Sequence, residues 1–496
     1  MEQGQSAQVP AAAVHHPLLR HLPNAFRPRP SLTFAVLILT VTAYTLLQSM
    51  VFPVLSVFER KYHTSQSAVT WILTAYLLSA SVATPVIGRI GDRIGKEKML
   101  RLVLACLGIG AIVSAAAPDL GVLLVGRVIQ GAGGAVFPLA FGIIRDEFPT
   151  DRVSGAIANV SALLAVGSGA GIVLAGPIVD NLGVNWVFWL PLALIIPAYV
   201  ATLLFLPISP LRPSGRLSRW AVLLLAAFLI TLLLGINQGP EWGWLSVGVW
   251  ALFAAAVLLG IAWVRVELSS RVPLVDMVMM RIPTVAAANL NAFLFGFSMY
   301  ATGVLIPQFV QTPSHAGYGF GASVTVSGLY LLPQTATVFV GGRIAGRYSE
   351  TLGSKNLLIG GSAASFLSLF ALVFAHDSAW EVIIAMATFG LGIGLAFGAL
   401  PNLVIQVVDA DQTGVATGMN ANIRTVGGAL GGTVTASLVA SAATASGLPG
   451  IHGWMLAFVT LTAVAGVALL TALLVPSDRR TPDRQPELHH RPAKAV

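Results

Sequence analysis

The chain has 496 residues, of which 56% are hydrophobic and only 10% are charged, and its mean hydropathy is +0.81. Because soluble globular proteins carry about a quarter charged residues, this composition excludes a soluble body and predicts an all-α polytopic membrane protein. The net charge of +8 does not indicate nucleic-acid binding, since the basic residues are spread over short loops. Cys106 is the only cysteine, which excludes an intrachain disulfide and a cysteine metal site.

The two ends of the chain are polar. Residues 1–31 combine His and Arg with prolines and alanines and lack the apolar core of a signal peptide, so we expect a cytoplasmic tail. Residues 477–496 form a second basic stretch, which we interpret as a second cytoplasmic tail.

Between the tails the sequence contains apolar runs long enough to cross a bilayer core of about 30 Å. They lie near 32–57, 69–88, 99–117, 120–144, 155–178, 186–207, 220–237, 246–264, 283–308, 324–344, 355–375, 380–407, 412–442 and 452–476. This pattern predicts a six-helix bundle over 32–207, a linker over 208–282 with two inserted helices, and a second six-helix bundle over 283–476. An even number of spans, fourteen, places most Lys and Arg on the side of both tails, which the positive-inside rule assigns to the cytoplasm.

The loop after the second run reads GRIGDRIGK and closely resembles the loop signature of the major facilitator superfamily. The match is carried by Gly88, Gly91, Asp92, Arg93, Gly95 and Lys96. The resemblance implies two pseudo-symmetric six-helix bundles and a loop that stabilises one access state. The alternative is a basic cytoplasmic loop with turn glycines, but membrane topology alone does not explain the acidic Asp92.

Part of this loop recurs in the second half of the chain. Gly88-Arg89-Ile90 with Arg93 is repeated as GRI with Arg343 and Arg347, and Pro53 as Pro307, all at one offset. The shared offset indicates an internal duplication.

The fourth run contains Arg127 and Gln130 in a segment that resembles the arginine motif of the same superfamily. An arginine inside an apolar helix costs several kcal/mol unless it faces water or a partner. The resemblance implies proton handling or gating by Arg127, and a purely structural arginine is the alternative.

The fifth run carries Gly167, Gly171, Gly176 and Pro177, similar to the antiporter motif of drug exporters. The spacing is one residue longer than usual, and Asp180 with its neighbour replaces a glycine pair. Antiport and simple close helix packing both explain such small residues.

In the second half, PLVD before the ninth run and TGVATG leading to Arg424 resemble segments of the 14-helix drug:proton antiporter family. Substrate binding, gating and helix bracing all remain open for Arg424. The family places an acid nine residues before the proline of helix 1, whereas this chain has Tyr44 before Pro53. No acid or histidine falls at an expected midplane, so Asp180 is the remaining candidate for proton coupling.

Further polar or aromatic residues on apolar runs are candidates for a substrate cavity. The full candidate set is Tyr44, Gln48, Trp71, Tyr76, Asn289, Asn291, Gln334, Asn420 and Arg424. For each of them interhelical hydrogen bonding is the alternative. Without a midplane acid, neutral, zwitterionic or amphipathic cargo is more natural than multivalent cations.

The sequence therefore predicts a secondary exporter of lipophilic or amphipathic small molecules, working by alternating access in the cell membrane and coupled to protons. A facilitator of lipid or metabolite without proton coupling is the alternative within transport. A membrane enzyme is disfavoured because the sequence has no HExxH or GxSxG motif, and a receptor is disfavoured by the arginine-bearing helices and the gating-loop motif. The sequence also has no ATP-binding motif, so transport driven directly by ATP is unsupported. We expect a monomer without cofactor or metal, contacting lipids and no nucleic acid.

Overall fold

The computed structural model describes residues 30–208, 218–270, 273–408, 413–442 and 449–476. Both expected tails and part of the expected linker lie outside these ranges. The helices of the first half are α1 (Pro30–Ser49), η3 (Phe52–Val54), α2 (Leu55–Tyr62), α3 (Gln66–Ile94), α4 (Lys96–Ala115), α5 (Leu120–Gln130), η4 (Gly131–Ala135), α6 (Val136–Glu147), α7 (Thr150–Leu182) and α8 (Trp186–Phe205).

The remaining helices follow in the same order as the expected runs. They are α9 (Arg219–Trp242), α10 (Val247–Ser269), η5 (Met279–Arg281), α11 (Pro283–Gln311), η6 (Ser314–Ala316), α12 (Val324–Leu352), α13 (Ser354–Phe374), α14 (Ala379–Ile405), α15 (Thr413–Ala440) and α16 (Ile451–Leu474).

Every expected apolar run coincides with a helix or with consecutive helices in the described part of the chain. Twelve segments among the described residues are long and apolar enough to cross a membrane, so the protein is a multi-pass membrane protein. The helices α7 and α15 are not among these twelve.

Two of the spans change helix type inside the predicted runs. Pro53 is the second residue of η3, between α1 and α2, where a proline fits because the first turn needs no N–H donor. The GAGGA segment forms η4 between α5 and α6. A Cβ at Gly131 or Gly134 would clash with Ser79 or Thr84, so these glycines let η4 lie directly against α3.

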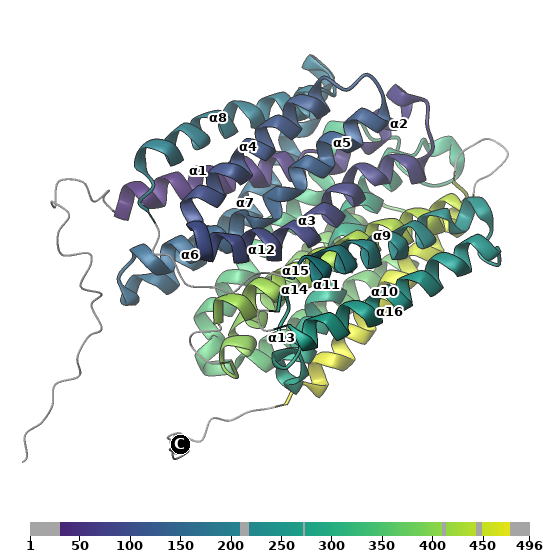
Figure 1. Ribbon diagram of the computed structural model, residues 1–496. Helices are drawn as coiled ribbons and strands as arrows, with labels where there is room; N and C mark the ends of the chain where they lie inside the picture. The colour runs from purple at the N-terminus through teal and green to yellow at the C-terminus, as the bar shows by residue number, and fades with distance from the viewer. Residues whose placement is uncertain (1–29, 209–217, 271–272, 409–412, 443–448, 477–496) are drawn as a thin grey trace, which may run out of the picture.

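The helices build two hydrophobic cores. One is dominated by side chains from α1 to α8, and the other by side chains from α11 to α16 with two leucines of α9. In Figure 1 the purple-to-blue helices gather together and the green-to-yellow helices gather beside them. The cores meet along two seams, where α7 packs against α12 and α3 packs against α15.

The pair α9 and α10 lies outside this arrangement. The two helices pack on each other, and α9 also contacts α3 and α15, one helix from each core. Leu229, Leu232 and Leu233 of α9 face Leu78 of α3 and Leu430 of α15 there. Most of α10 is exposed, as expected of a helix that faces lipid.

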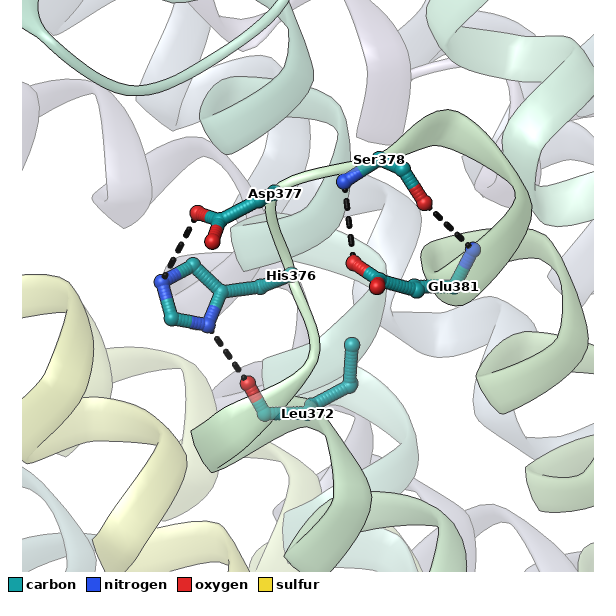
Figure 2. Close-up of polar contacts among 5 residues, drawn as sticks. All are labelled: Leu372, His376, Asp377, Ser378 and Glu381. Carbon is teal, nitrogen blue, oxygen red and sulfur yellow. Dashed lines mark hydrogen bonds and ion pairs between the residues drawn. The ribbon is translucent and has the colours of Figure 1, made fainter.

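Turns at the helix ends explain several features of the sequence. Gly95 and Gly353 follow α3 and α12 with φ of 116° and 80°, values that favour glycine, and they are 258 residues apart. The motif repeat has an offset of 254, so Arg343 and Arg347 lie about one turn farther from their glycine than the equivalent positions of the first loop. Figure 2 shows the start of α14, where Ser378 and Glu381 form a capping box.

Candidate functional site

The two ends of the bundle differ in their contacts between the cores. We call one the α2 end, where α1 and α7 finish and α3 and α12 begin, and the other the gating-loop end, which carries Gly88–Lys96. Hydrogen bonds join the two cores at the α2 end: Ser56 with Gln311, Gln66 Nε2 with Gln308 Oε1 at 2.5 Å, and Thr325 Oγ1 with Asp180 Oδ2 at 2.7 Å. These bonds hold the cores together at the α2 end.

A chain of polar side chains crosses from one core to the other in the middle of the bundle. Tyr76 donates to the hydroxyl of Tyr44 at 2.7 Å, and Gln48 Nε2 donates to the hydroxyl of Tyr300 at 2.7 Å. All except Tyr300 were predicted cavity candidates, and Tyr300 comes from α11 of the second core. The structure therefore brings Tyr44, Gln48 and Tyr76 together, as one polar cluster.

Arg127 is completely buried beside this cluster. Its Nε donates to the carbonyl of Ile72 at 2.8 Å, a second nitrogen donates to Gln130 Oε1 at 2.5 Å, and its guanidinium lies over the Tyr76 ring at 4.6 Å. Gln130 donates in turn to Ser114 Oγ at 3.2 Å. One terminal nitrogen of Arg127 has no partner among the described residues. The arginine is thus bonded to its own core, and one of its terminal nitrogens is unbonded within the described part of the chain.

Arg424 approaches the same cluster from α15. Its guanidinium lies 4.5 Å from the centre of the Phe397 ring, and its charge interacts with the hydroxyls of Tyr300 and Tyr44. Tyr44 is also within electrostatic range of Arg127, so both arginines act on the cluster. In the described part of the chain no residue accepts a hydrogen bond from the Arg424 side chain.

The carboxylates lie far from this cluster along the helices. Apart from Glu59 in the short α2, every Asp and Glu within a described helix is within three residues of a helix end. Asp180 is third from the end of α7, where its side chain is exposed and bonded to Thr325. The proton-coupling candidate is therefore part of the contact between cores at the α2 end.

The other cavity candidates lie elsewhere. Asn420 Nδ2 donates to Asn289 Oδ1 at 2.9 Å, which links α15 to α11 nearer the gating-loop end. Asn291 donates to Thr471 of α16. Gln334 is buried on α12, and Trp71 is partly buried on α3. The structure does not bring these five side chains into the central cluster.

The small residues of α7 face alternately toward the two cores. A Cβ at Gly167 or Gly171 would clash with Thr45 or Ser49 of α1, and a Cβ at Gly176 would clash with the backbone of Thr325 on α12. Pro177 is exposed inside the same helix. The glycines of the antiporter-like motif therefore let α7 pack closely between α1 and α12.

The gating-loop motif forms a buried ion pair inside the first core. Lys96 Nζ lies 2.5 Å from Asp146 Oδ2 of α6, with both side chains less than 5% exposed. Gly91 packs against Leu139 and Met99, Gly88 has open space around it, and Arg93 is exposed. The Asp92 side chain lies outside those that the structure describes. In the second half Arg343 and Arg347 are both exposed.

A second connection at this end was not predicted from the sequence. Arg89 donates to the carbonyl of Pro273 at 2.9 Å, while Glu267 of α10 accepts from the backbone N–H of Leu274 at 2.8 Å. Both bonds hold the PLVD segment that precedes α11. The motif loop and the inserted pair of helices are therefore joined through this segment.

Comparison with known proteins supports the helical membrane bundle. The family model of the Major Facilitator Superfamily matches residues 37–432. The chain belongs to this superfamily. Its helical spans are accordingly those of a member of the superfamily, and no catalytic family is indicated.

Individual members of the superfamily are similar over most of the chain. The tetracenomycin C resistance and export protein of Streptomyces glaucescens is 26% identical over 436 residues, which are 87% of this chain and 79% of that protein. A multidrug resistance protein B homolog of Mycobacterium tuberculosis is 25% identical over 385 residues, 75% of this chain and 69% of that protein. The crystal structure of an auto-inhibited POT family peptide transporter shares the fold, with a TM-score of 0.63, 16% identity, and coverage of 89% of this chain and 96% of that one.

Proposed function

We propose that this member of the superfamily exports lipophilic or amphipathic small molecules across the cell membrane by alternating access. The observation that carries the proposal is the bond from Gln48 to Tyr300, which joins the two cores in the middle of membrane-spanning helices. A buried polar cluster between two otherwise apolar bodies is costly unless it has a function. The names of the resistance and export relatives support export.

We further propose that α7 and α15 also cross the membrane, which gives fourteen spans in two related bundles, 32–207 and 283–476, with the inserted pair between them. Equivalent packing supports this organisation. In the first half α1 contacts α7 and α8, and in the second half α11 contacts α15 and α16. With both termini in the cytoplasm, the α2 end faces outward and the structure represents a state closed on the outside.

Proton coupling through Asp180 forms part of the proposal. As a carboxylate Asp180 accepts the hydrogen bond from Thr325 at the α2 end, and a charged acceptor makes the stronger bond. Protonation would weaken this contact between cores and favour opening. Arg127, which has a terminal nitrogen unbonded to any described residue and lies against Tyr76, is the candidate for gating or proton handling within the central cluster.

The experiment is flux of the neutral dye Nile red in proteoliposomes with the monomeric full-length protein, with and without an imposed pH gradient. We expect gradient-driven flux in the wild type, its loss in Arg127→Ala, and loss of the gradient response in Asp180→Asn. Asp377→Asn is the matched control, because this exposed carboxylate lies at the same end. Absence of protein-dependent flux would refute export.

The position of the carboxylates favours a second candidate, a facilitator without proton coupling. No described spanning helix carries Asp or Glu near its middle. Flux that runs down the gradient of the dye and ignores pH in both wild type and Asp180→Asn would identify this facilitator.

A further inference from the structure

The central cluster has an imbalance of charge that export of a neutral compound does not explain. Arg127 and Arg424 both lie along helices that pass through the body, and the described helices place their carboxylates at the ends. Arg127 is fully buried and Arg424 is partly buried, and proteins normally balance a charge that is removed from water with a counter-charge. The cluster therefore has the electrostatics of an anion site.

Arg424 is the better placed of the two arginines to meet an anion. Arg127 uses its nitrogens on Ile72 and Gln130 of its own core, whereas Arg424 contacts the Phe397 ring and donates to none of the described residues. A guanidinium with free donors binds a carboxylate or another planar anion through paired hydrogen bonds.

The tyrosine hydroxyls beside Arg424 are also able to donate. The Tyr44 hydroxyl accepts from Tyr76 and the Tyr300 hydroxyl accepts from Gln48, so each retains its own proton for another acceptor. Hydroxyl donors next to a guanidinium increase the affinity of a site for negative charge.

Aromatic rings surround these donors. Phe52 lies 5.8 Å from the Tyr300 ring, and Phe137 lies 5.9 Å from the Tyr44 ring, with Phe397 beneath the guanidinium. Such rings favour a flat aromatic body over an aliphatic one. Gly428 contacts the Tyr300 ring closely, which holds this tyrosine between α11 and α15.

We propose that Arg424, together with Tyr44 and Tyr300, binds the anionic group of an aromatic cargo, a carboxylate or an acidic phenol. This inference rests on the proposed export function and specifies its cargo. It differs from export of lipophilic cations, for which the described residues offer no acidic partner at this depth.

The test is binding of two tritiated probes to the purified full-length protein in detergent, measured by scintillation proximity. Naphthalene-2-carboxylate and naphthalene-2-carboxamide have the same rings and differ in charge. We expect the wild type to bind the carboxylate about tenfold to a hundredfold more tightly, as one charge-assisted pair provides. Arg424→Gln should bring the ratio close to one with unchanged amide binding, and Arg281→Gln, an exposed arginine, should keep the preference.

Equal affinities in the wild type, or a preference that persists in Arg424→Gln, would overturn the proposal. If Arg424→Gln binds neither probe, Arg424→Lys decides, because it keeps the charge: a retained preference supports the anion site and a lost one refutes it. Chloride is the other possible source of negative charge, so binding is measured in gluconate and in physiological chloride. Loss of the preference in chloride would assign the site to that ion and refute the cargo.

The same probes distinguish failure of this inference from failure of the proposed function. Protein-dependent flux of the carboxamide in proteoliposomes, without any preference for the carboxylate, would refute the anion site and leave export intact. Absence of flux for both probes and for Nile red would refute export itself.

Discussion

The ion pair between Lys96 and Asp146 provides a quantitative test of the gating-loop interpretation. Their charged atoms are 2.5 Å apart and their side chains are 4% and 3% exposed. Lys96→Met removes the positive charge next to the buried Asp146, and breaking a buried ion pair by removing one partner costs about 3–5 kcal/mol. With an unfolding entropy of about 2 cal/mol/K per residue, a chain of this length loses roughly 1 °C per kcal/mol, so we expect the melting temperature to fall by about 3–5 °C.

The single cysteine makes the assay simple. Cys106 is a free thiol, partly buried in the same helix as Lys96, and a thiol-reactive dye gains access to it as the protein unfolds in detergent. Lys98→Met is the matched control, since this lysine is exposed two residues away. Its melting temperature should stay within about 1 °C of the wild type, because exposed charges contribute little.

The double variant Lys96→Met with Asp146→Leu separates loss of the whole pair from removal of one partner. Replacing a whole buried pair by apolar side chains is often close to neutral, so the double variant should recover to within about 1 °C of the wild type. A Lys96→Met protein as stable as the wild type, or a double variant no better than the single one, would contradict the reasoning.

Three further predictions concern the seams and the polar contacts. Gly176→Val should force α7 away from α12, and this overpacking costs the state closed at the α2 end about 1–3 kcal/mol. The population of that state should fall roughly tenfold relative to the open state, and Nile red flux should decrease. Gly360→Val, with open space around it, should leave the flux unchanged. Glu267→Ala should lower the melting temperature by about 1–3 °C, because two backbone N–H groups before α11 lose their acceptor; no change would exclude that role. Tyr300→Phe and Gln48→Leu should each lower kcat/KM for flux, and the double variant should be no worse than either, whereas additive losses would show that their bond is unimportant.

Much of the fold is predictable from hydropathy, because the bilayer fixes the length of each span. The expected runs coincide with the observed helices, and twelve meet the criteria for spans. Tyr44, Gln48 and Tyr76 were selected because they are polar residues within apolar runs, and these three residues lie together in the central cluster. The general rule that a polar side chain inside a span needs a partner was sufficient there.

The partners themselves were not predictable. A helix that is apolar on all sides has no amphipathic stripe to define its rotation, so nothing in the sequence shows that Asn291 faces α16 or that Tyr300 faces Gln48. Glu267 belongs to no motif that the sequence predicted, although the structure buries it. Such contacts depend on how distant helices meet, which a single sequence does not encode locally.

The position of α9 across the seam has a mechanical consequence. This helix contacts α3 of one core and α15 of the other, so any rotation of the cores relative to each other must slide α9 along at least one of them. The contact there is made by leucines with valine and alanine neighbours, whose attraction is non-directional and changes little over small displacements. The inserted pair can therefore slide along the two bodies at little energetic cost, which keeps the bodies aligned while lipid is excluded from the gap between them.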